Sequence, residues 1–99
     1  MKITVNTSNP PVVEIDTESR SAYVRFLSTA VARTIEPKQF ANGQIVTIDL
    51  DSKGRVVGIE LIGVEQFNIE ALLVRVPMVT VKRQLLEKVR YVAVSKVSA

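Results

Sequence analysis

The sequence predicts an α+β fold in which a small antiparallel β-sheet, a meander of hairpins with about four to five strands, carries C-terminal helical elements on one face. Three observations predict it. Between residues 12 and 62, runs rich in β-branched side chains alternate with polar turns. A hairpin with a glycine in its turn lies near the middle of the chain. After Pro77, apolar residues recur at spacings of three and four, as one stripe of an amphipathic helix requires.

The first half of the chain contains three predicted strands and a possible short edge strand before them. Residues 3–5 could form a short edge strand before a stretch rich in turn-forming residues. Residues 12–16 and 22–27 are rich in β-branched and aromatic side chains and flank a polar turn, which is typical of a hairpin. Residues 30–36 are a plausible further strand, which ends at Pro37.

The strongest local signal is a hairpin formed by residues 45–50 and 56–62. Their connection, residues 51–54, ends in Gly54, where a short hairpin loop often needs a positive φ. Because side chains alternate along a strand, three residues of each strand share a face that we expect to be the core. These are Val46, Ile48, Leu50, Val57, Ile59 and Leu61. Thr47, Asp49 and Glu60 are expected on the other face.

The C-terminal third has two interpretations. Asn68 is a good N-cap for a short helix over residues 69–73, and Pro77 interrupts that helix. Beyond it, an amphipathic helix would carry one apolar stripe of Met78, Val81, Leu85, Val89 and Val92. The rival interpretation is two strands, residues 74–81 and 89–94. We favour the helix because residues 82–90 contain good helix formers without glycine or proline, although residues 91–94 could be extended.

Length and composition suit one domain. The chain has 99 residues, 46% of them hydrophobic, which is enough for one core. We expect residues 12–64 to form the antiparallel core and residues 65–99 to form a basic, largely helical extension of the same domain. No apolar run approaches the roughly 20 residues that a membrane span needs, and the N-terminus lacks the pattern of a signal peptide. We therefore expect a cytoplasmic protein without a membrane partner.

Cysteine and histidine are both missing from the sequence. Without cysteine, the chain can form neither a disulfide nor a thiolate metal site. Without histidine, it lacks the side chain best suited to proton transfer near neutral pH and the commonest ligand of transition metals. We expect no cofactor and no catalytic residue, and a function other than catalysis.

One part of the chain resembles a known family. The order of Asp16, an Ala-Tyr strand over residues 21–25, Arg33-Thr34, and the run from Ile48 to Glu60 is similar to the prokaryotic family called domain of unknown function 2283. The resemblance covers roughly residues 12–64, and Gly-Arg-Val-Val-Gly-Ile-Glu is its most specific part. It implies a compact antiparallel β fold with short helical elements, and it implies no activity. Any specialised role of this member could lie in the remaining C-terminal residues.

Four carboxylates are candidates for chemistry. Asp16, Asp49, Asp51 and Glu60 could converge on magnesium or calcium, or act as an acid and base pair. A structural role is the favoured interpretation, because Asp51 stands where hairpin turns use aspartate to bond the backbone and because the spacing of a calcium loop is not met. A carboxylate or metal-dependent enzyme is therefore the third of our functional hypotheses.

Basic residues are concentrated near the C-terminus. Residues 71–99 contain six basic side chains and one acidic side chain, whereas residues 1–70 contain seven basic and nine acidic ones. Lys82, Arg83, Lys88, Arg90 and Lys96 could contact the phosphates of a nucleic acid. A basic helix is more often simply solvated, and no helix-turn-helix or aromatic RNA signature accompanies these residues. Nucleic-acid binding is our second hypothesis.

Self-association is the first hypothesis. Val56, Ile62, Val64 and Phe67 fall on the face opposite the predicted core stripe or just beyond it, and together they would form an apolar patch. Symmetric dimers are the commonest way to bury such a patch, so a homodimer is expected. The sequence thus favours a non-enzymatic interaction or regulatory module that acts as a homo-oligomer with an unidentified protein partner. The protective half of a bacterial two-protein system is one role compatible with so small a domain.

Overall fold

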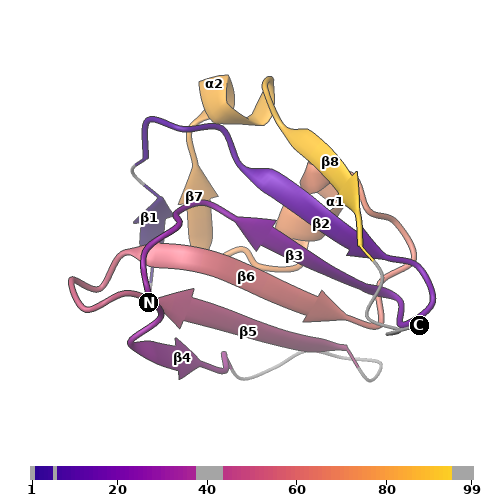
Figure 1. The fold of residues 1–99 in the computed structure, drawn as a ribbon, viewed down its shortest axis with the longest axis horizontal. Coiled ribbons are helices and arrows are strands. Elements are labelled where there is room, and N and C mark those ends of the chain that lie inside the picture. The colour runs from indigo at the N-terminus through magenta and orange to yellow at the C-terminus, as the bar shows by residue number, and fades with distance from the viewer. Residues whose placement is uncertain (1, 6, 38–43, 95–99) are drawn as a thin grey trace.

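The computed structural model describes residues 2–5, 7–37 and 44–94, which form two β-sheets and two short helices (Figure 1). The main sheet has six strands in the order β4-β5-β6-β3-β2-β8. Its strands are β2 (Val12–Asp16), β3 (Ser21–Arg25), β4 (Arg33–Ile35), β5 (Ile45–Leu50), β6 (Val56–Ile62) and β8 (Arg90–Ala93). The second sheet pairs β1 (Ile3–Val5) in parallel with β7 (Val79–Val81), and the helices are α1 (Ile69–Val74) and α2 (Arg83–Leu86).

The main sheet is mostly antiparallel, but it is larger than the predicted one and its strands do not follow chain order. The hairpins β2–β3 and β5–β6 form as predicted. However, β6 lies between β5 and β3, so β4 lies at the edge instead of beside β3. This order is possible because the segment after Arg25 is long enough to pass β6, and because Val57 O accepts hydrogen bonds from Phe26 N (2.8 Å) and Leu27 N (3.1 Å) as that segment departs.

One face of the main sheet forms the core, and α1 covers it from behind in the view of Figure 1. The predicted core residues of β5 and β6 are all buried, but Val57 is not part of the core cluster. A bulge opposite Leu50 changes the alternation at one point, because Leu50 pairs with Val56 and not with Val57. The alternation in the sequence predicted Val56 on the other face, but the bulge turns its side chain into the core cluster.

The C-terminal third corrects the helix that we favoured there. Asn68 does cap α1, since its Oδ1 accepts a hydrogen bond from Ala71 N (2.9 Å). After α1, however, the chain forms β7, a single helical turn and β8 in place of one long helix. The two-strand interpretation is closer to the structure. Strands form because β1 and β2 each present an unpaired edge, along which the valine-rich segments pair in parallel.

Neither helix of the described residues could cross a membrane, because both are far too short.

Candidate functional site

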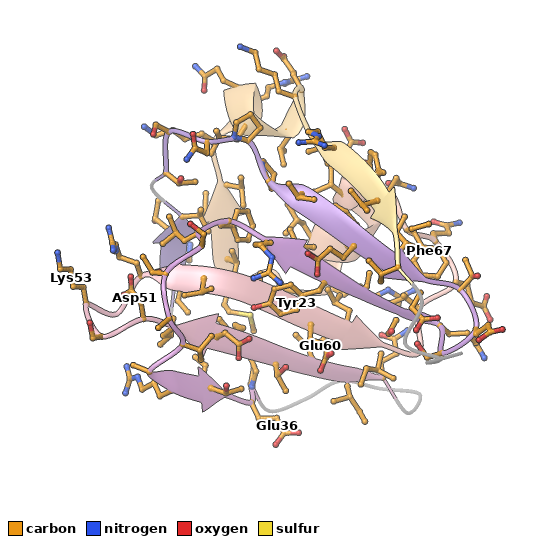
Figure 2. All side chains as sticks on the ribbon, viewed as in Figure 1. Tyr23, Glu36, Asp51, Lys53, Glu60 and Phe67 are labelled. Atoms are coloured by element: carbon orange, nitrogen blue, oxygen red, sulfur yellow. The ribbon has the colours of Figure 1, made fainter. Side chains whose placement is uncertain are left out.

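The face of the main sheet that α1 leaves uncovered carries mostly polar side chains and is here called the open face. In Figure 2 it faces the viewer, with Tyr23 and Glu60 near its centre. Tyr23 pairs with Glu60 on one side and with Glu14 on the other. Thr47 and Asp49 also belong to this face, as the alternation of β5 predicts. These side chains are half-buried, so neighbouring residues restrict them although neither helix of the described residues covers them.

A hydrogen-bonded group of three side chains crosses the open face from β3 to β4. Asp49 accepts a hydrogen bond from the Tyr23 hydroxyl (2.7 Å) and another from Thr34 Oγ1 (2.6 Å). Burial, followed by the hydrogen bond to Asp49, raises the pKa of Tyr23 well above its usual value of 10.0. The phenol therefore remains a neutral donor to the carboxylate over the physiological range.

Gly58 makes the position of Tyr23 possible. A side-chain carbon at residue 58 would collide with the far end of the Tyr23 ring. Glycine thus lets the ring lie against the backbone of β6 and reach Asp49 on the strand beyond it. Arg25 lies over the ring, with its guanidinium carbon 4.8 Å from the ring centre. Hydrogen bonds to Glu14, at 3.1 and 3.3 Å, hold that guanidinium and raise the pKa of Arg25.

Asp51 organises the β5–β6 turn, as its position in the sequence predicts. Its Oδ1 accepts hydrogen bonds from the backbone N–H groups of Lys53 and Arg55, both at 2.9 Å. Its Oδ2 accepts one from Arg55 Nε at 2.8 Å. Burial opposes ionisation of this carboxyl, but the hydrogen bonds from Arg55 and Lys53 outweigh it, so the pKa of Asp51 lies below its usual value.

The four candidate carboxylates do not converge on one site. Asp16 Oδ1 accepts hydrogen bonds from the backbone of Glu18 and Ser19 in the β2–β3 turn. Asp49 and Glu60 lie on the open face, and Asp51 serves the other hairpin turn. Across residues 2–5, 7–37 and 44–94, no group of three acidic side chains is arranged to hold a metal ion.

Strand β8 forms one edge of the main sheet and is exposed along its whole length. Its side chains are largely apolar: 49% of Tyr91 and 37% of Val92 is accessible to solvent. Tyr91 lies on the same side of the sheet as α1, where its hydroxyl accepts a hydrogen bond from Ile69 N (3.0 Å). Val92 pairs with Glu14 and so lies on the open face. The sequence allowed for an extended segment here but gave no sign that it would be a sheet edge.

The predicted basic residues lie around α2 and at the start of β8. Lys82, Arg83, Lys88 and Arg90 are all exposed, whereas Lys96 lies outside the described residues. They are not presented by one helix, because α2 contains only Arg83 among them. Arg83 shares a cavity with Glu70 and Glu87, which reduces the local positive charge.

The predicted self-association patch does not form as a surface. Val56 and Val64 are buried in the core of the chain itself, because the bulge and the turn after β6 direct them inward. Ile62 is half-buried at the end of β6, and Phe67 packs partly against the core. Because Val56 and Val64 are buried, the four residues do not form one exposed patch.

These features define a small mixed-sheet protein with an ordered polar face and an exposed apolar edge strand. The chain belongs to the family described as "Protein of unknown function (DUF2283)", which matches residues 13–64, more than half of its length. The matched region contains Tyr23, Asp49, Gly58 and the Asp51 turn. It ends before α1, β7, α2 and β8. Comparisons with curated proteins and with solved structures found no match.

Proposed function

We propose that this chain is a non-enzymatic interaction module that forms a homodimer by pairing the β8 edges of two copies. The observation that carries the proposal is the exposed apolar edge of the main sheet. Natural proteins usually protect such an edge with charged side chains, proline, a bulge or a covering element. Within β8 the only such device is Arg90, at the first position of the strand.

The backbone of β8 supports pairing on its outer side. Arg90 N donates a hydrogen bond to Pro11 O (3.2 Å), and Val94 N donates one to Ile15 O (2.8 Å). The backbone N–H and C=O groups of successive residues point to opposite sides of a strand. The backbone groups of Tyr91 and Ala93 therefore point away from β2. No strand of the described residues lies on that side. Another strand can therefore bond there without displacing any bond of the monomer.

A second copy suits this edge better than an unrelated strand. Antiparallel pairing about a two-fold axis places each β8 on its own equivalent and brings Tyr91 and Val92 of both copies together. The same arrangement places the two Arg90 side chains at opposite ends of the pair, so their positive charges stay apart. A parallel pairing would instead bring these charges side by side.

The test compares two substitutions at one residue. Ala93→Pro removes an N–H that points outward and leaves the bonds to β2 in place, whereas Ala93→Ser keeps that N–H. We expect sedimentation equilibrium to show a dimer for the wild type and for Ala93→Ser, and a monomer for Ala93→Pro, with unchanged circular dichroism for all three. A wild type that stays monomeric at every soluble concentration refutes the dimer, and a dimer that persists in Ala93→Pro refutes its placement at β8.

Nucleic-acid binding remains a second candidate because of one observation. None of the three ion pairs of the described residues involves any of the four exposed basic residues around α2. If these residues bind phosphates, replacing Lys82, Arg83 and Arg90 together by glutamine should weaken binding of a labelled oligonucleotide for every sequence and flatten its salt dependence. Fluorescence anisotropy at rising salt measures both. Unchanged binding in the triple variant would refute this candidate.

A further inference from the structure

A cavity of about 440 Å³ lies beside α1, and its described lining residues include none of β8. The described residues that line it come from three segments of the chain: Gln44 precedes β5, Gln66 lies between β6 and α1, and three residues belong to α1 or its C-terminal end. Those three are Ala71, Val74 and Arg75. Residues three and four apart share one side of a helix, so all three can line one cavity. Ile69 and Leu72 of α1 are instead buried in the core.

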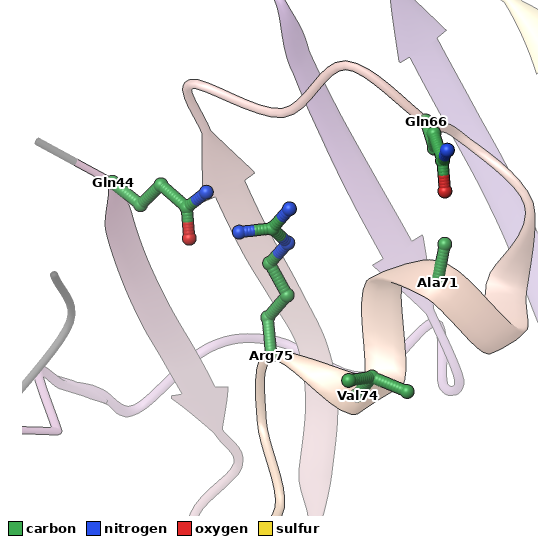
Figure 3. A pocket seen from close by; sticks show the side chains of 5 residues that line it. All are labelled: Gln44, Gln66, Ala71, Val74 and Arg75. Carbon is green, nitrogen blue, oxygen red and sulfur yellow. The ribbon is translucent and has the colours of Figure 1, made fainter. Parts of the chain in front are cut away.

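The polar groups of this cavity are those that recognise an anion. Figure 3 shows the Arg75 guanidinium and the Gln44 amide extending toward each other, with the Gln66 amide above Ala71. Guanidinium nitrogens only donate hydrogen bonds, and each glutamine amide has two further N–H donors. None of the described lining residues is acidic. The ion pairs of the described residues do not include Arg75, so its charge is available to a ligand.

Two other cavities show why this one is distinctive. A cavity of similar volume near α2 contains Arg83, but it also contains Glu70 and Glu87, so two carboxylates oppose its one cation. A smaller one, of about 190 Å³, contains Arg55, whose Nε bonds Asp51 at 2.8 Å. Among the described residues that line these three cavities, only those at Arg75 combine a cation with additional donors and no opposing carboxylate.

We propose that this cavity binds a carboxylate that carries a short aliphatic group. The planar guanidinium matches the two oxygens of a carboxylate, and the neighbouring amides can donate further hydrogen bonds to them. Ala71 and Val74 supply an apolar wall, and Val74 is 77% exposed. The volume falls within the range of ordinary small-molecule sites. This site does not depend on the pairing of β8.

The experiment is a titration of isotope-labelled full-length protein followed by nuclear magnetic resonance at constant ionic strength. The probes are acetate, butyrate, N-acetyl-leucine and inorganic phosphate. We expect saturable shifts of the Arg75 Nε–H signal and of the Gln44 and Gln66 side-chain amides, larger for butyrate than for acetate. Arg75→Gln should weaken butyrate binding about tenfold or more, because a hydrogen-bonded charge pair is lost. Arg33→Gln, which removes an exposed arginine outside these cavities, should leave binding unchanged.

Each outcome has one meaning. Shifts that do not saturate, or that persist equally in Arg75→Gln, refute the site. Phosphate binding as tight as that of butyrate refutes the assignment to a carboxylate. Tighter binding of N-acetyl-leucine than of butyrate identifies the C-terminus of a peptide as the source of the carboxylate, whereas the reverse order identifies a free aliphatic acid. Val74→Ser should remove the preference for butyrate over acetate, and a preference that survives it refutes the role of the apolar wall.

Discussion

The family-matched sheet and the C-terminal third are built by different means. In the sheet, β5 and β6 are six and seven residues long; β5 buries one side of its alternating pattern, and the first four residues of β6 are all buried. After α1, the regular elements are three, four and four residues long. The spacing of apolar residues in the sequence determines the secondary structure where an element is long enough to bury several residues on one face. Elements of one turn or a few residues take the conformation that their neighbours allow.

The same contrast appears in the packing. The centre of the sheet is closed on both sides by antiparallel neighbours, whereas β7 and β8 attach in parallel to strands from the beginning of the chain. The C-terminal strands therefore depend on β1 and β2 for their backbone hydrogen bonds. Perturbing the sheet should affect both regions, and perturbing the C-terminal third should affect mainly itself.

The largest expected effect separates the core of the sheet from the C-terminal third. Ile59 is completely buried at the centre of the sheet, and Ile59→Ala should lower the free energy of unfolding by about 4 kcal/mol. Leu85 of α2 is 8% exposed and lies outside the main core cluster, so Leu85→Ala should cost about 2 kcal/mol, at the low end for such substitutions. Urea unfolding measures both. Equal losses would contradict the difference between the two regions.

The next effect tests the contact between Tyr23 and Gly58. Gly58→Ala should cost about 2 kcal/mol, because the new methyl group displaces the Tyr23 ring from Asp49 and from Arg25. In a Tyr23→Ala background, the same change should cost much less. A double-mutant cycle of unfolding free energies measures this coupling. If the two substitutions were additive, the ring would not be the obstacle.

A smaller effect concerns the β5–β6 turn and depends on pH. Because the pKa of Asp51 is lower in the folded than in the unfolded chain, its ionised form stabilises the fold above the ordinary value of 3.8, and this contribution is lost as pH falls through the folded-state pKa. Asp51→Asn keeps an oxygen acceptor but removes the charge. It should lower the melting temperature near pH 7, and the difference from wild type should shrink in acid. A constant difference across pH would contradict this account.

The smallest effect concerns an ion pair that joins the two regions. Arg20 and Glu65 lie 2.8 Å apart at the end of the sheet, but both side chains are largely exposed. Glu65→Gln should therefore change the free energy of unfolding by less than about 0.5 kcal/mol, and the difference should disappear in high salt. Chemical denaturation in low and high salt measures it. A loss comparable to that of Gly58→Ala would mean that this pair holds the C-terminal third to the sheet.

Local signals in the sequence predicted the parts of the fold that local physics determines. The Asp51 turn, the inward face of β5 and the Asn68 cap each depend on residues close together in the chain. The position of β6 and the parallel attachment of β8 depend on which edges are free after the hairpins form, which no local pattern contains. The burial of Val56 follows from a bulge that shifts the alternation by one residue.

The candidate sites were harder to predict for the same reason. Edge strand β8 is recognisable only once its neighbour β2 is known. The cavity at Arg75 requires Gln44 and Gln66 to approach from two other segments. The basic residues around α2 could be predicted because they are close together in the chain. The prediction that one helix presents them was wrong, because α2 contains only Arg83 among them.

The pairing of β8 with β2 also sets an order of events during synthesis. Val12 leaves the ribosome long before its partner Arg90, whereas β2, β3 and β6 can pair as soon as Ile62 has emerged. Until β8 emerges, the nascent sheet ends in β2, and the unpaired backbone groups along that edge can bond to other chains. The newborn protein is therefore most prone to misassembly in this interval, and the slow, non-local closure of β8 ends it.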